Sequence, residues 1–229
     1  MKRTELKNLI SIAAGKKKAD LVLKNCSIIN VLTSEIVEGD IAIYNGKIAG
    51  IGDYTGEKEI DVEGKFIAPG FIDGHVHIES SMASPSQFAK AIVPRGTTTI
   101  IADPHEIANV SGTDGIKYIL DDSENIPLDV YIMLPSCVPA TPFENSGANL
   151  KAEDLRELID HERVLGLGEL MNYPGVINGD EEVLDKILLA KGKKIDGHGP
   201  LINAGQLNAY IASGISTEHE CSTVEDMKN

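Results

Sequence analysis

Apolar residues recur at helical spacing near the start of the chain and alternate like those of strands directly afterwards. In residues 4–14 they fall three and four positions apart, which predicts a surface helix with Thr4 as its N-cap and Gly15 at its end. In residues 20–66, short β-branched segments are separated by Asn-Gly, Gly-Asp and Glu-Gly pairs, of which Asn45-Gly46 is the clearest turn. This region predicts a small antiparallel β unit.

From Ile67 onward, strand-like apolar segments alternate with segments of helical periodicity. The predicted strands cover residues 66–78, 97–103, 128–134, 163–170, 193–199 and 214–220. The predicted helices cover residues 85–93, 112–122, 151–161, 181–191 and 203–213. Such alternation predicts an α/β fold with a parallel sheet and right-handed crossovers.

The count of strands leaves two architectures open. Six strands precede Asn229, whereas a closed barrel of this type takes eight. A doubly wound open sheet would expose its edges unless another segment covers them. The alternative is a barrel truncated after about six strands, and the candidate chemistry described below favours it.

Composition and charge narrow the class of partner. Apolar residues make up 42% of the chain and charged residues 24%, as in globular proteins. The net charge of -14 repels phosphate, and aromatic residues amount to only 4%. We therefore expect no nucleic acid and no membrane surface among the partners.

Cysteine content and the N-terminal segment indicate the compartment. The three cysteines are widely spaced and form no CxxC pair, so neither a disulfide framework nor a cysteine zinc site is expected. The N-terminal segment lacks the apolar core of a signal peptide, and no stretch approaches the roughly 20 apolar residues of a membrane span. A cytoplasmic location is the simplest interpretation.

A pair of histidines marks the first barrel strand. His75 and His77 are two positions apart, so on a strand both imidazoles point to the same side and can hold one metal ion. A pair of hydrogen-bonded structural histidines would give the same pattern. Asp73 is in phase with them and can act as a ligand or orient a ligand histidine.

Three further side chains occupy the corresponding place on later strands. Glu169, His198 and His219 lie at the ends of the fourth, fifth and sixth predicted strands, where barrel enzymes carry their active sites. Each alone reads as an ordinary loop residue. Four histidines and one glutamate at matching places predict a shared metal centre, in which a carboxylate can bridge two cations.

The remaining motifs do not identify a second kind of site. His105 follows the second strand and can line the pocket, bind an auxiliary metal, transfer protons or cap the next helix. The sequence has no phosphate-binding loop, no GxSxG nucleophile motif and no HxE…PCxxC motif of base-flipping zinc deaminases.

Five segments together resemble the amidohydrolase superfamily and, within it, the adenine deaminases. They are PGFIDGHVHIESSM, GTTTIIADPHEIANV, GLGELMNYPGV, DGHGP and STEHE, and they occur in the order found in that family. The resemblance implies a (β/α)8 TIM barrel of the metal-dependent hydrolase type and a small β-sandwich. Residues 1–66 would supply the helix and part of the sandwich, and residues 67–229 an incomplete barrel.

The resemblance also implies an activity: adenine and water would yield hypoxanthine and ammonia at a binuclear centre of manganese or iron, with zinc possible. His75 and His77 would bind one cation, Glu169 would bridge, and His198 and His219 would bind the second. Glu169 and His219 would be catalytic. The residues expected to contact the purine are Glu79, Ser80, Ser81 and His105.

The chain departs from that family in length. The relatives carry a metal-binding aspartate on strand eight, which has no counterpart here, so we expect a fragment that is not fully active alone. One alternative is an amidohydrolase that opens a cyclic amide or removes an acetyl group; another is an inactive metal-binding module. Uncovered sheet edges favour a homo-oligomer.

Overall fold

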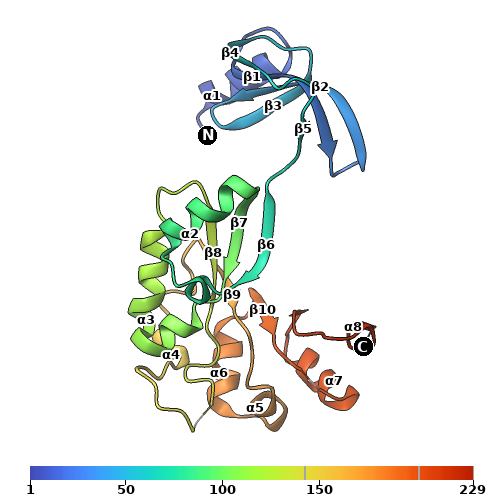
Figure 1. Ribbon diagram of the computed structural model, residues 1–229. Helices are drawn as coiled ribbons and strands as arrows, with labels where there is room; N and C mark the ends of the chain where they lie inside the picture. The colour runs from blue at the N-terminus through green and yellow to red at the C-terminus, as the bar shows by residue number, and fades with distance from the viewer. Residues whose placement is uncertain (142, 201, 229) are drawn as a thin grey trace. The chain divides into compact units, whose positions relative to one another are not determined.

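The computed structural model describes residues 1–141, 143–200 and 202–228. The chain divides into two compact units, Met1–Pro69 and Gly70–Asn229. Each unit has its own sheet, with five strands in the first and six in the second (Figure 1).

The first unit consists of one helix and a small sheet. Its elements are α1 (Arg3–Ala13), β1 (Ala19–Asn30), β2 (Glu35–Tyr44), β3 (Lys47–Gly52), β4 (Gly56–Asp61) and β5 (Phe66–Ile67). The fully buried Ile12 anchors α1 to the sheet through Ala19, Val22 and Ala42. The helix ends as predicted at Gly15, whose φ of 69° closes the last turn. Thr4 is not the N-cap: Lys2 holds that position, and its backbone N–H donates to the Glu5 carboxylate at 2.7 Å.

The sheet of the first unit is mixed rather than wholly antiparallel. β1 pairs antiparallel with β2, and β2 with β3 across the predicted Asn45-Gly46 turn. β4 and β5 instead pair parallel with β1, so the expectation of an antiparallel unit is wrong for these two strands. Turn residues identify hairpins between neighbouring strands, but they do not specify that β4 joins the far side of β1.

The second unit alternates strands and helices as predicted. Its strands are β6 (Phe71–Val76), β7 (Thr97–Ala102), β8 (Asp129–Leu134), β9 (Val164–Leu167), β10 (Lys194–Gly197) and β11 (Thr217–Glu218). Its longer helices are α2 (Pro85–Ile92), α3 (His105–Asp122), α6 (Glu181–Leu189) and α7 (Ala204–Ala212). The shorter helices are η1 (Ile78–Ser81), η2 (Val93–Arg95), α4 (Ala152–Leu155), α5 (Tyr173–Asn178) and α8 (Val224–Lys228).

The strand order identifies the architecture. The sheet runs β11-β10-β9-β8-β7-β6 with every pair parallel, so strands adjacent in sequence are adjacent in space. A doubly wound sheet would reverse direction at a switch point, and this order does not. The sheet also curls. This follows from the rings of His75 and His219, which come from its two edge regions and stack with centroids 3.8 Å apart. The predicted (β/α) barrel type is confirmed, with six of its strands among the residues that the structure describes.

Several predicted helices have different bounds. The one predicted at residues 112–122 starts at His105, because α3 continues through a kink at Gly112, whose φ of 61° and ψ of -142° are not helical. The one predicted at residues 151–161 shortens to α4, and α5 and α8 had no prediction. The predicted strand at residues 66–78 splits, since Phe66 and Ile67 pair with β1.

The core of the second unit supports the carboxyl ends of the strands. Ile100 of β7, Ile132 of β8 and Leu167 of β9 belong to this core and are at most 1% exposed. In Figure 1, α2 and α3 lie along one face of these strands. Within the described residues we find no helix with the length and apolar character needed to cross a membrane.

Candidate metal centre

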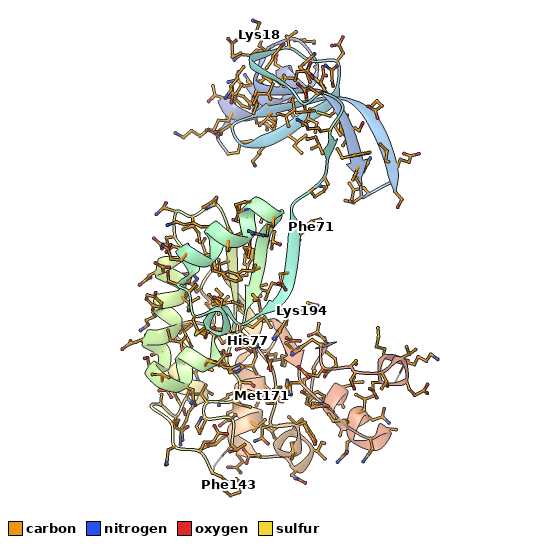
Figure 2. All side chains as sticks on the ribbon, in the orientation of Figure 1. Lys18, Phe71, His77, Phe143, Met171 and Lys194 are labelled. Carbon is orange, nitrogen blue, oxygen red and sulfur yellow. The ribbon has the colours of Figure 1, made fainter. Side chains whose placement is uncertain are left out.

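Five predicted side chains converge at the carboxyl ends of four strands. His75 lies in β6 and His77 directly after it, while Glu169, His198 and His219 follow β9, β10 and β11. In Figure 2, His77 lies at the carboxyl end of β6, whereas Phe71 marks its amino end. Parallel strands place their carboxyl ends together, and the fold therefore gathers these residues from distant parts of the sequence.

Glu169 lies at the middle of this group and is only 3% exposed. Its Oε1 is 2.8 Å from Nε2 of both His75 and His77, and 3.8 Å from Nε2 of His219. Its Oε2 is 2.8 Å from Nδ1 of His198. The two oxygens of one carboxylate therefore contact different histidines, which is the arrangement a bridging ligand requires.

Two glycines make room for this arrangement. A Cβ at Gly166 would lie 1.8 Å from the backbone oxygen of Lys194, on the neighbouring strand β10. A Cβ at Gly168 would lie 2.0 Å from Oδ2 of Asp103. The next strand and an acidic side chain therefore occupy the space that a side chain at these two positions would need.

The histidines and acids of this group shift one another's pKa values. The Asp196 carboxylate, followed by Glu169, raises the pKa of His75 to about 9. Glu106, followed by Glu169, raises the pKa of His77 to about 11. Burial favours the neutral acid at Glu169, but the neighbouring His75 and His77 outweigh burial and hold its pKa well below the usual range. In the protein without cations, positive imidazolium groups thus balance the buried carboxylate.

The donor set fits divalent cations. Although His198 Nδ1 lies 2.8 Å from Glu169 Oε2, the angles are not those of a hydrogen bond, and within the described residues this buried nitrogen has no hydrogen-bonding partner. Glu169 Oε1 and His219 Nδ1 are likewise buried without a hydrogen-bonding partner among the described residues. Ligand atoms within 4.8 Å of one another include the groups His75–His77–Glu169 and Glu169–His198–His219. Imidazole and carboxylate ligands suit zinc, iron and manganese.

Three acids of this site were missed by the sequence reasoning. Asp103 follows β7 directly, and both of its carboxylate oxygens are buried without a hydrogen-bonding partner among the described residues. Glu106 Oε2 lies 3.5 Å from His77 Nδ1, and Asp196 Oδ2 lies 3.3 Å from His75 Nδ1. A usable signal existed: Asp103 ends the second strand, and Asp196 precedes His198 by two positions, the spacing that identified His75 and His77.

His105 lies beside the centre. Its ring centroid is 4.6 Å from that of His77, and its Nδ1 and Nε2 face Asp103 at 3.5 Å and Glu106 at 3.8 Å. These acids contact opposite nitrogens of one ring, so the three residues form a chain of polar contacts. Ligand atoms of His105 also lie within 4.8 Å of those of His77 and Glu106, and of those of Asp103 and Glu169. His77 Nδ1 lies 2.9 Å from the Asp103 carbonyl oxygen, to which its N–H donates, and this leaves His77 Nε2 facing Glu169.

The remaining predicted residues are Glu79, Ser80 and Ser81, which lie on η1 after β6, and Asp73, which lies on β6. Glu79 accepts from the Ile107 N–H at 3.2 Å, and its other oxygen is buried without a hydrogen-bonding partner in the described part of the chain. The Ser80 hydroxyl donates to Glu106 at 3.4 Å, whereas that of Ser81 donates to the Ile78 carbonyl within η1. Asp73 is exposed and accepts from the His75 backbone N–H at 3.3 Å, so it does not join the cluster.

Comparisons with known proteins identify relatives of this chain. The chain is 62% identical over 220 residues to an adenine deaminase of Clostridium acetobutylicum, covering 95% of this chain and 39% of that protein. It is 57% identical over 223 residues to adenine deaminase 2 of Carboxydothermus hydrogenoformans, covering 97% and 39%. The chain thus spans about two fifths of the length of these relatives.

Structural similarity supports the fold. The zinc complex of atrazine chlorohydrolase from Arthrobacter aurescens matches 84% of this chain and 56% of its own chain, with a TM-score of 0.60 at 14% identity. The model of the amidohydrolase family matches residues 66–229, which contain every candidate ligand named above. The chain belongs to the amidohydrolase family.

Proposed function

We propose that this chain carries the metal-binding part of an adenine deaminase, which hydrolyses adenine to hypoxanthine and ammonia. The observation that carries the proposal is the position of Glu169, buried between four histidines with its two oxygens directed at different ones. The substrate comes from the relatives, which are named adenine deaminases and are 51–62% identical to this chain.

The proposed ligand assignment follows two groups of neighbouring ligand atoms, His75–His77–Glu169 and Glu169–His198–His219. His75 and His77 would bind one cation, His198 and His219 would bind a second, and Glu169 would bridge them. Manganese or iron is the proposed metal, and the donor set is also compatible with zinc. Divalent cations held here acidify water, which supplies the nucleophile for hydrolysis near neutral pH.

The reaction needs an activated water and a proton for the leaving amine, and residues of this chain can serve the first need. The oxygen of water adds at C6 of adenine, the C6–N bond breaks, and the amine must gain a proton to leave as ammonia. Glu169 stays ionised because His75 and His77 lower its pKa, so it is available as a ligand, and its proposed catalytic role is to hold the cations that would act on water. His219, with Nε2 3.8 Å from Glu169, completes the catalytic pair.

The purine is proposed to lie over the loops that follow β6 and β7. Glu79 has a buried oxygen that no described residue satisfies, and His105 lies next to His77. Ser80 and Ser81 belong to the same 3-10 turn as Glu79, and they complete the proposed substrate contacts.

Parts of the proposal concern the longer protein. Residues 1–66 form part of a composite β-sandwich, and residues 67–229 form the first portion of a (β/α)8 barrel. We propose that the protein acts in the cytoplasm as a homo-oligomer, with adenine and water as its small-molecule partners.

The test is ammonia release by the chain loaded with Mn²⁺, Fe²⁺ or Zn²⁺, alone and with the additional length found in the relatives. Adenine should be deaminated, dihydropyrimidines should not be opened, and Glu169→Gln should lower metal content and turnover together. The control is His161→Gln, because His161 belongs to none of the candidate ligand groups among the described residues. Hydrolysis of the cyclic amide instead of adenine, or unchanged metal content in Glu169→Gln, would contradict the proposal.

A further inference from the structure

Asp196 is a buried carboxylate whose two oxygens face different partners. It lies in β10, and the residue is 9% exposed. Oδ1 accepts the Gly197 backbone N–H at 3.0 Å and the Thr217 hydroxyl at 2.5 Å. One oxygen is therefore fixed by hydrogen bonds from β10 and β11, and this fixes the direction of the other.

The second oxygen of Asp196 faces two imidazoles. Oδ2 lies 3.3 Å from Nδ1 of His75 and 3.5 Å from Nδ1 of His219. The two rings stack with an interplanar angle of 19°. Their opposite nitrogens, both Nε2, face Glu169 Oε1 at 2.8 and 3.8 Å. Each ring thus lies between the Asp196 and Glu169 carboxylates.

A neutral imidazole has one N–H, and the nitrogen without a hydrogen is the one that binds a metal. A carboxylate that accepts the Nδ1 hydrogen favours the tautomer with a free Nε2 lone pair and makes that nitrogen a stronger ligand. Asp196 Oδ2 faces Nδ1 of both His75 and His219 as such an acceptor would, although in the structure without cations the angles at His219 are not those of a hydrogen bond. His198 differs, because it faces Glu169 through Nδ1.

We propose that Asp196 is a positioning residue that holds one histidine of each cation site in the ligating tautomer, through one shared oxygen. This rests on the proposed function, in which His75 and His219 bind different cations. His75 lies on β6 and His219 follows β11, the two edge strands of the sheet. Asp196 therefore links the two sites directly, and its loss weakens both at once.

The experiment compares Asp196→Asn with Thr217→Val by Mn²⁺ titration of the metal-free chain. In Asp196→Asn, an amide oxygen that keeps the bonds from Gly197 and Thr217 turns the NH₂ group toward both imidazoles, which favours the wrong tautomer. We expect affinity at both sites to fall about 10- to 100-fold. Thr217→Val removes a bond to Oδ1 but keeps the carboxylate, so it should bind two equivalents with near-normal affinity.

The outcomes separate this inference from the proposed function. If Asp196→Asn binds two Mn²⁺ ions as tightly as the unmodified chain, or weakens one site only, the shared role of Asp196 is wrong. If both sites weaken although adenine is not deaminated, the positioning role stands and the proposed substrate fails. If Thr217→Val weakens both sites equally, Asp196 only ties β10 to β11, and the inference fails.

A second measurement does not depend on any variant folding. In the Zn²⁺-loaded unmodified chain, imidazole ¹⁵N spectra report which nitrogen of each ring carries hydrogen. Nδ1–H is expected for His75 and His219, and Nε2–H for His198. A metal-bound Nδ1 at His75 or His219 would overturn the proposal.

Discussion

His75 and His219 stack face to face, with ring centroids 3.8 Å apart, although their strands β6 and β11 lie at opposite edges of the sheet. The contact requires the six parallel strands to curl, and it brings one ligand from each proposed cation site into direct contact. Glu169 lies at the Nε2 side of both rings. The fold thereby builds the centre from segments more than 140 residues apart.

The first prediction is that cation binding releases protons from His75 and His77. The pKa of His75 is raised to about 9 and that of His77 to about 11 in the metal-free protein, and their Nε2 atoms lie 3.0 Å apart, so the pair holds at least one extra proton at pH 7. A cation that binds at Nε2 must displace protons from these rings, so the affinity for the cation should rise with pH. The release of a proton from His75 should decline above about pH 9, where that ring has already lost its proton. Calorimetric titration in two buffers of different ionisation enthalpy measures the release. An enthalpy that is equal in both buffers would contradict this prediction.

The second prediction concerns Gly168. A methyl group there meets the Asp103 carboxylate, which is buried and has little space to move, so Gly168→Ala should destabilise the chain by about 1–3 kcal/mol. Urea unfolding measures the loss. Gly74→Ala in β6 is the matched control, because its Cβ would meet no described atom within 4 Å. Equal unfolding free energies for the two variants would show that Asp103 does not limit this position.

The third prediction concerns Tyr210, which ties the segment carrying His198 to β9. Its buried hydroxyl donates to the Leu170 carbonyl at 2.7 Å and accepts the His198 N–H at 3.0 Å. Tyr210→Phe leaves both backbone groups unsatisfied, so it should cost about 1–3 kcal/mol and weaken the cation bound by His198 more than the other. Urea unfolding and Mn²⁺ titration measure the two effects. Tyr118→Phe, which changes an exposed tyrosine of α3, serves as the control; equal weakening at both cation sites would argue against this role.

The strands of the second unit and the meeting of the four histidines with Glu169 were predictable from sequence. Apolar periodicity identifies strands, and parallel strands end at one edge, so ligands that follow them must meet. What the sequence did not reveal depends on pairing at a distance. The parallel partners of β1 and the kink at Gly112 have no local signal, and α4 is shorter than its pattern because the residues after Leu155 form turns whose Leu158 and Ile159 are buried all the same.

The acids of the centre were less predictable than its histidines. Asp103, Glu106 and Asp196 contribute through the histidines they contact, and such contacts are decided by side-chain direction in the folded sheet. An acid near a strand end has many ordinary explanations, whereas a histidine two positions from another has few. Spacing in the sequence therefore identifies the candidate ligand histidines more readily than the acids that orient them.

The most direct test of the central claim is a crystal structure of the Mn²⁺-loaded chain with anomalous data at the manganese edge. Two peaks are predicted, one beside His75 and His77 and one beside His198 and His219, each within about 2.0–2.3 Å of a different Glu169 oxygen. Peaks that lie away from Glu169, or a single ion bound without it, would contradict the account.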